Sequence, residues 1–159
     1  MIPFYKRNIE YLTAHSVDPD RRRYSDPKEA VRHYIDLEHY SNEPFDSIPR
    51  FWKDAVAKYS EDTLQEHGIV PWHISLMILR LTDAFREMNP DKILYQSANL
   101  GHYIADAHVP LHTTENYNGQ KTNQRGIHGF WETRLPELFS ENWNFLVGRA
   151  KYIQKTDKE

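Results

Sequence analysis

The segment Ser97–Glu132 constrains this chain most, because it concentrates side chains that bind metal ions through nitrogen and oxygen. Residues four apart on a helix share a face, so His102 and Asp106 can point at one ion. The same spacing relates His128 to Glu132. The chain has no cysteine, which excludes disulfides and thiolate ligands. The potential ligands of this segment are His102, Asp106, His108, His112, His128 and Glu132.

Spacing alone supports these pairs only weakly. With nine histidines and 23 acids in 159 residues, chance gives about one histidine with an acid four places later, and the chain has three. The third pair, His39 and Glu43, runs into a predicted helix end and is expected at the surface. His102 and Asp106 lie among apolar residues, where a buried charge needs a partner or a metal ion. The segment His128–Glu132 is interleaved with aromatic residues and is expected to be half-buried.

Four further residues could belong to a metal site, but each can also be explained by a purely structural role. His112 lies just past Pro110-Leu111, at the end of the predicted buried helix, so it is either a helix-end cap or a metal ligand. His108 lies two residues beyond Asp106, on the opposite side of the helix, and is expected to pack away from the ligands. Asp36 and His73 lie far away in sequence. Taken alone, they are an ion-paired acid and a hydrogen-bonded histidine.

The hydrophobic pattern predicts an all-α fold, an irregular multi-helix bundle in a single domain of residues 1–159. Asp18–Asp20 is predicted as a turn and Arg21–Arg23 as a solvated basic loop. The helix over residues 91–107 is apolar or small almost all round, so neighbours are expected on every side, with close approach at Gly101. Thr113–Arg125 is predicted as a polar loop. Other helices are predicted over residues 3–15, 27–40, 51–59, 63–66, 71–88, 126–135, from 136, and 143–153.

Charge and hydropathy exclude several classes of protein. The formal net charge is -3 at pH 7 and both signs are mixed, so no stable nucleic-acid partner is expected. No apolar run approaches the ~20 residues of a membrane span, and no transmembrane segment is expected. Met1–Lys6 lacks the basic start and apolar stretch of a signal peptide.

The spacing of the candidate ligands resembles a known superfamily, the zinc-dependent phospholipases C and S1/P1 nucleases. The likeness is closest to bacterial zinc-dependent phospholipase C-like proteins and extends from the first helix through Phe139. Its motifs are His102-x3-Asp106-x5-His112 with Pro110-Leu111, then His128-x3-Glu132, and upstream His33-Tyr34-Ile35-Asp36 and Pro71-Trp72-His73.

The resemblance implies an all-helical domain that holds zinc ions in a cleft. It assigns Asp36, His73, His102 and Asp106 to a first zinc, and His112, His128 and Glu132 to a second. It also gives Asp36 the catalytic role of orienting the attacking water. A third zinc in the family needs an N-terminal tryptophan and a nearby histidine. This chain begins Met1-Ile2, like the family pattern without its leading segment and with an early C-terminal end, so two zinc sites are expected.

The same resemblance implies hydrolysis of a phosphodiester substrate and a periplasmic or secreted location. The substrate is either a phospholipid, as for a phospholipase C, or single-stranded nucleic acid, as for an S1/P1 nuclease. A zinc-binding domain without turnover is a further alternative. A His-Asp metal phosphohydrolase would need an adjacent His-Asp doublet, which is absent. Asn123 and Arg125 are either phosphate contacts or part of a solvated loop.

Overall fold

The computed structural model describes residues 2–144, except for the side chains of Ile2 and Phe45. This part is helical and contains no β-strand, which confirms the predicted all-α class. None of its helices is long and apolar enough to cross a membrane. The α-helices are α1 Ile2–Arg7, α2 Ile9–His15, α3 Asp18–Arg22, α4 Pro44–Ser47, α5 Trp52–Tyr59, α6 Glu61–His67, α7 Val70–Arg86, α8 Pro90–Ala107, α9 Ile127–Gly129 and α10 Leu135–Phe139. Short 3₁₀ turns cover Ala30–Arg32, Leu37–His39, Pro110–His112 and Ser140–Asn142, and a π-helix covers Phe130–Arg134.

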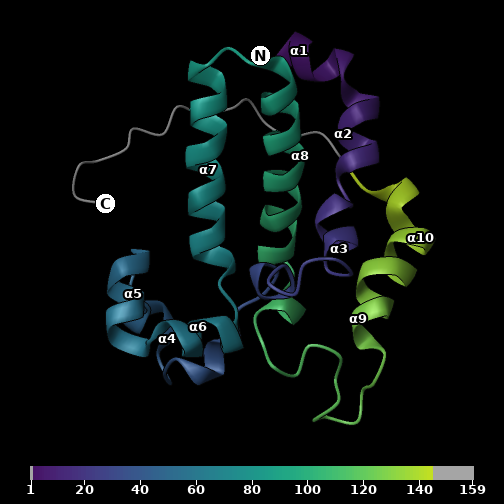
Figure 1. Ribbon diagram of the computed structural model, residues 1–159. Coiled ribbons are helices and arrows are strands. Elements are labelled where there is room, and N and C mark those ends of the chain that lie inside the picture. Colours follow the sequence, from purple (N-terminus) through teal and green to yellow (C-terminus); the bar gives the residue numbers. More distant parts are fainter. Residues whose placement is uncertain (1, 145–159) are drawn as a thin grey trace.

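The two long helices α7 and α8 stand side by side and form the frame of the molecule (Figure 1). α7 begins with Pro71 in its first turn, where a missing N–H costs nothing. α8 begins at Pro90 behind the N-cap Asn89, whose side chain accepts a hydrogen bond from the Lys92 N–H. The helices α2 and α3 lie against α8, and α5 and α6 pack together near the start of α7 (Figure 1).

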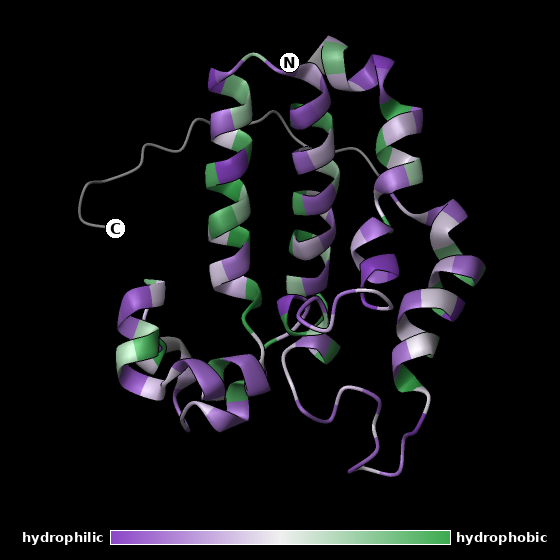
Figure 2. Ribbon diagram, in the orientation of Figure 1, coloured by the Kyte–Doolittle hydropathy of each residue, from purple (hydrophilic) through white to green (hydrophobic). Residues whose placement is uncertain are grey.

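The hydrophobic core lies where α5, α6 and the segment before α7 meet the start of α7. Its polar atoms are paired: the Trp72 indole N–H donates to the Pro49 carbonyl at 3.1 Å, and the Tyr40 hydroxyl donates to the Gly68 carbonyl at 3.1 Å. Hydrophobic positions also recur along the rest of α7 (Figure 2), and several of these stay exposed, including Leu79. The buried cluster consists of Ile35, Tyr40, Ala55, Leu64, Val70, Trp72, Met77 and Tyr103.

The predicted helix over residues 27–40 is wrong. The segment forms only two 3₁₀ turns, Ala30–Arg32 and Leu37–His39, with an irregular stretch between them. In that stretch the backbone bonds to distant segments instead of to itself. Ile35 N–H donates to the His112 carbonyl at 2.9 Å, and Asp36 N–H donates to the His67 carbonyl at 2.7 Å. These tertiary bonds satisfy the backbone polar groups that a helix would have paired internally.

Other predictions differ in smaller ways. Asp18–Asp20 is not a free turn but the start of α3, with Pro19 in its first turn. Gly101 is exposed and has nothing packed against it, so α8 is not enclosed on every side. The helices predicted over 51–59, 63–66, 71–88 and 91–107 correspond to α5, α6, α7 and α8. The predicted helix over 143–153 falls almost entirely outside the described residues.

We predict that the turn at Gly68 tolerates no side chain. Gly68 has φ +92°, and a Cβ there would overlap the carbonyl group of Tyr34. Gly68→Ala is therefore expected to lower the free energy of unfolding by about 3 kcal/mol, measured by urea denaturation.

Two other glycines distinguish the effect of the steric clash from that of the strained backbone. Gly126 has φ +98° in open space, so Gly126→Ala carries only the backbone strain, about 1 kcal/mol. Gly101 lies in the helix α8 in open space, and Gly101→Ala should stabilise by up to about 1 kcal/mol. Equal losses for Gly68→Ala and Gly126→Ala would contradict the predicted clash.

Candidate metal centre

A first group of nitrogen and oxygen ligands gathers around the C-terminal half of α8. His33 Nδ1 lies 2.8 Å from Asp106 Oδ2, and His102 Nε2 lies 3.3 Å from the same oxygen. The two ring nitrogens are 3.2 Å apart. Asp20 Oδ1 completes the group at 3.7 Å from each ring nitrogen. Four side chains therefore come together here: Asp20 from α3, His33 just after a 3₁₀ turn, and His102 and Asp106 from α8.

A second group adjoins the first through Asp106. The other oxygen of Asp106, Oδ1, lies 3.9 Å from His112 Nδ1. His112 Nε2 is 3.0 Å from Glu132 Oε1, and His128 Nε2 is 2.9 Å from Glu132 Oε2. The sequence prediction that His102 faces Asp106 and that His128 faces Glu132 agrees with this geometry.

Three of the histidines are held by backbone carbonyls that fix which nitrogen carries a proton. Nδ1 of His102 donates to the Ser16 carbonyl at 2.9 Å, and Nδ1 of His112 donates to the His33 carbonyl at 2.7 Å. Nδ1 of His128 donates to the Tyr117 carbonyl at 3.2 Å. A carbonyl only accepts, so each neutral ring has its lone pair on Nε2, the atom that faces the carboxylates. Such anchoring is the usual support of metal-binding histidines.

The Nε2 lone pairs that face the carboxylates require a cation between them. An unprotonated Nε2 of His102 facing the carboxylate of Asp106 places two acceptors against each other, which is costly in a buried site. A proton on the ring or a metal ion between the atoms relieves this conflict. The set contains imidazole and carboxylate donors only, which fits Zn²⁺, and two adjoining groups fit two ions. Residues Asp20, His33, His102 and Asp106 would hold the first ion, and His112, His128 and Glu132 the second.

The electrostatics of the first group follow the same logic. Burial alone would raise the pKa of Asp106, but hydrogen bonds from His102 and His33 hold this pKa far below its usual range. Burial disfavours the protonated form of His102, yet the hydrogen bond to Asp106 and the charges of Asp106 and Asp20 raise the pKa of His102. Asp106 is thus a permanent negative charge between the two groups.

Short, irregular elements position most of these side chains. His33 follows the 3₁₀ turn Ala30–Arg32, and His112 ends the 3₁₀ turn Pro110–His112. Asn118 sets the start of α9, because its side chain accepts from the Gly126 N–H at 2.9 Å and the His128 N–H at 3.4 Å. Glu132 lies in the π-helix Phe130–Arg134, a rare geometry that is frequent at functional sites.

A buried carboxylate stands behind His33. Glu29 is fully buried, and its Oε1 lies 3.6 Å from His33 Nε2, the ring nitrogen that faces away from Asp106. The Tyr103 hydroxyl donates to Glu29, and Arg32 pairs with it at 2.5 Å. Arg22 pairs with Glu29 at 3.4 Å, so this member of the predicted solvated basic loop instead balances an internal charge.

Asp36 and His73, which the resemblance assigns to the first zinc, lie elsewhere. Asp36 faces His67 Nδ1 at 3.7 Å and forms a separate group with His67 and His39. Burial and the charge of Glu38 raise its pKa. The ring of His73 packs edge-on against Tyr103 with centroids 4.5 Å apart, and burial lowers the pKa of His73 to about 4.

The reason for this difference is the path of the chain around residue 33. The backbone bonds of the irregular stretch turn Asp36 toward the end of α6, while His33 faces α8. Asp20 and His33 therefore take the places expected for Asp36 and His73. The motif His33-Tyr34-Ile35-Asp36 did contain a member of the group, His33. The sequence around Asp20 shows only a charged residue beside a proline, which does not predict a metal ligand.

His108 and His39 lie outside both groups, as predicted. His108 is exposed at the end of α8 and donates from Nδ1 to the Ile104 carbonyl at 2.7 Å. His39 is exposed and pairs with Glu115 at 3.0 Å. Asn123 and Arg125 lie exposed in the loop before α9.

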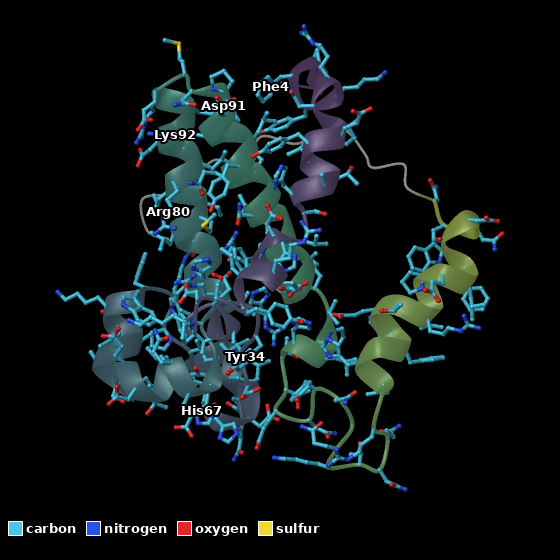
Figure 3. All side chains as sticks on the ribbon, turned by 45° about the vertical axis from the view of Figure 1, so that its right-hand side comes forward. Phe4, Tyr34, His67, Arg80, Asp91 and Lys92 are labelled. Atoms are coloured by element: carbon cyan, nitrogen blue, oxygen red, sulfur yellow. The ribbon has the colours of Figure 1, made fainter. Side chains whose placement is uncertain are left out.

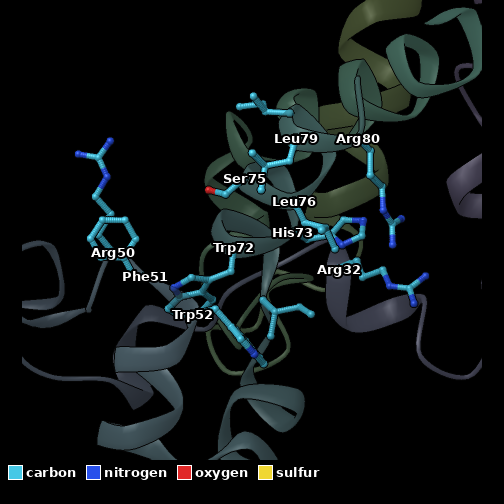
Figure 4. A pocket seen from close by; sticks show the side chains of 12 residues that line it. Arg32, Arg50, Phe51, Trp52, Trp72, His73, Ser75, Leu76, Leu79 and Arg80 are labelled. Atoms are coloured by element: carbon cyan, nitrogen blue, oxygen red, sulfur yellow. The ribbon is translucent and has the colours of Figure 1, made fainter. Parts of the chain in front are cut away.

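A cavity of about 760 Å³ lies on the α7 side of the molecule, apart from the two ligand groups. Trp52, Trp72 and Arg50 line it, and His73 is the expected metal ligand that borders it (Figure 4). Its walls are mainly apolar, and it holds no carboxylate, so it does not offer the donor set of a metal site.

The comparisons with known proteins point to one family. The family described as zinc dependent phospholipase C matches residues 2–159. No curated protein and no solved structure matches the chain.

We predict that Arg22 helps to stabilise the charge of Glu29 behind His33. Arg22→Met removes one of the two guanidinium groups that pair with this buried carboxylate and leaves Arg32 in place, so it should lower the free energy of unfolding by about 2 kcal/mol in urea denaturation. The neighbouring Arg21→Met is the control. Arg21 is 67% exposed and pairs with Asp18 on the surface, so its loss should stay within about 0.5 kcal/mol. Equal effects of the two variants would contradict a structural role of Arg22.

Proposed function

Because the chain belongs to the zinc-dependent phospholipase C family, we propose that it is a zinc-dependent phosphodiester hydrolase of the phospholipase C type. The observation that carries this proposal is the pair of ligand groups that adjoin each other at Asp106 and His112. Two neighbouring cations suit a reaction in which negative charge develops on the attacking and leaving oxygens of a phosphodiester.

Bound zinc would supply a Lewis acid for the phosphate and would lower the pKa of nearby water. The residues of the chain supply the rest. Asp20 is the most open ligand of the first group, with 52% of its side chain exposed, whereas those of His33, His102 and Asp106 are buried to at least 88%. Its Oδ1 faces the two imidazoles, which leaves Oδ2 to accept the proton of the attacking water. Hydrolysis joins the water oxygen to phosphorus, breaks the phosphorus–oxygen bond, and returns a proton to the leaving alcohol.

Asp20 thus replaces Asp36 in the catalytic role that the resemblance implies. Asp36 stands in a different group of ligands, and its carboxylate faces His67. Asp106 cannot take this role, because it lies between the two groups and hydrogen bonds from His102 and His33 hold its pKa far below its usual range.

The surroundings of the second group favour a phospholipid as substrate. The side chains of Tyr117, Phe130 and Trp131 are about half exposed, and the Tyr117 ring lies 6.0 Å from that of His128. Exposed aromatic rings suit the boundary between water and lipid, where one part of the ring is wet and the other apolar. The same rings can stack on bases, so an S1/P1-type single-strand nuclease remains the second candidate.

We predict that His33, and not His73, binds the first zinc. His33→Ala should weaken the affinity for one zinc ion by more than about 100-fold. This loss is larger than that caused by changing a residue that only supports a ligand. His73→Phe preserves an aromatic ring against Tyr103 and should retain that zinc. The measurement is zinc per chain by elemental analysis after dialysis against a chelating buffer, with circular dichroism as the check on folding. Loss of zinc in His73→Phe with retention in His33→Ala would reverse the assignment.

We predict that the zinc-loaded chain releases diacylglycerol from phosphatidylcholine and hydrolyses bis(p-nitrophenyl) phosphate. Chelation should abolish both activities, and Asp20→Asn should lower the turnover rate by about 100-fold or more, as loss of a proton acceptor does. Single-stranded DNA is the competing substrate in the same assay. Release of nucleotides without release of diacylglycerol would favour the nuclease, and zinc binding without either product would leave a non-catalytic zinc domain.

A further inference from the structure

We propose that Asp36, His39 and His67 form a separate binding site for a divalent transition-metal cation, distinct from the two groups around Asp106. Each of the three offers one ligand atom, and these atoms lie within 4.8 Å of one another. The site joins the 3₁₀ turn Leu37–His39 to the end of α6, and His67 marks its position in Figure 3. We call these three residues the Asp36 site.

The two imidazoles of the Asp36 site stand in an arrangement that needs an explanation. The rings of His39 and His67 are stacked, with centroids 3.8 Å apart and planes 9° apart. His67 Nδ1 faces Asp36 Oδ2 at 3.7 Å, too long for a hydrogen bond. Parallel rings point their lone pairs in parallel directions, so the three groups are close enough to share a cation once one ring tilts toward it. No hydrogen bond joins the three groups to one another.

The carboxylate of Asp36 is the second, independent observation. The side chain of Asp36 is 12% exposed, and although Asp36 precedes a 3₁₀ turn, its side chain does not cap that turn. No hydrogen bond from a described residue reaches this carboxylate. A largely buried carboxylate that accepts no hydrogen bond from the protein is costly unless a cation balances its charge. The free oxygen faces the imidazoles, where a bound ion would compensate it.

The charge around the Asp36 site points the same way. Glu115 accepts from His39 Nε2 at 3.0 Å, and Glu38 is held by the Thr114 hydroxyl at 2.7 Å. With Asp36 these make three carboxylates beside two imidazoles. Lys121 pairs with Glu115, and the Lys121 side chain is more than half exposed. The local excess of negative charge attracts cations to the site.

The donor set selects the kind of ion. Ca²⁺ and Mg²⁺ prefer oxygen ligands throughout. Two imidazoles with one carboxylate instead suit zinc and similar first-row ions. Glu115, which pairs with His39 Nε2 at 3.0 Å, is close enough to bind the ion in place of that contact. Such an ion would hold the turn Leu37–His39 against α6. The same turn pairs with the loop that leads to α9, because the Leu37 N–H donates to the Thr113 carbonyl at 3.2 Å.

The test is a zinc count on the full chain, stripped with a chelator and reloaded with zinc alone. The wild-type chain is expected to hold about three zinc ions, and the double variant His39→Ala/His67→Ala about two. Asp36→Asn should weaken the same ion without changing the shape of the side chain. His108→Ala is the matched control, since His108 is exposed and bound to a backbone carbonyl, and it should hold as many ions as the wild type.

A second double variant separates this proposal from the proposed function. His102→Ala/His128→Ala removes one ligand from each of the two groups of the candidate metal centre and should still retain one zinc, while hydrolysis is lost. His39→Ala/His67→Ala should lose one zinc and keep hydrolysis of bis(p-nitrophenyl) phosphate. An unchanged zinc count in His39→Ala/His67→Ala, with folding confirmed by circular dichroism, overturns the Asp36 site. A chain that binds one zinc at the Asp36 site without hydrolysis would support it and contradict the proposed function.

Discussion

The convergence of two imidazole nitrogens, from His33 and His102, on the buried carboxylate of Asp106 is the interaction on which the candidate centre depends. Its two oxygens face different ligand groups, one toward His33 and His102 and the other toward His112. The Ser16 carbonyl holds the outer nitrogen of His102, so this ring cannot turn away from Asp106 without losing a hydrogen bond. The His33 carbonyl likewise holds His112 with its Nε2 toward Glu132. The chain is therefore preorganised around a position that only protons or metal cations can make stable.

The fold supplies this centre with two kinds of support. The long helix α8 fixes His102 and Asp106 relative to each other by its own geometry, since residues four apart share a face. The remaining ligands come from short turns whose shape depends on contacts with other segments. Behind His33 lies Glu29, which is buried and bound by Tyr103, Arg22 and Arg32. Ordered short elements around a rigid helix are a common way to place functional side chains precisely.

The stretch from His33 to His39 serves two groups of ligands. His33 faces Asp106, whereas Asp36 and His39 face His67. A regular helix here would have placed His33 and Asp36 nearly on the same side, three residues apart. The observed backbone instead bonds to His67, His112 and Thr113, and these bonds divide the stretch between the two groups. The position of each side chain thus follows from which distant carbonyl its backbone meets.

The sequence by itself determined the all-α class, the long helices and the local pairs of ligands. The period of apolar residues along α7 and α8 is a local property, and so is the spacing of His102 to Asp106 and of His128 to Glu132. Only the tertiary structure decided which distant residues join them. Asp20 and His33 meet His102 because α3 packs against α8 and because His33, just after the turn Ala30–Arg32, pairs with Asp106 on α8. Asp36 and His73 have other partners. Spacing along a chain carries no information about contacts between segments dozens of residues apart, which arise from the packing of the whole molecule.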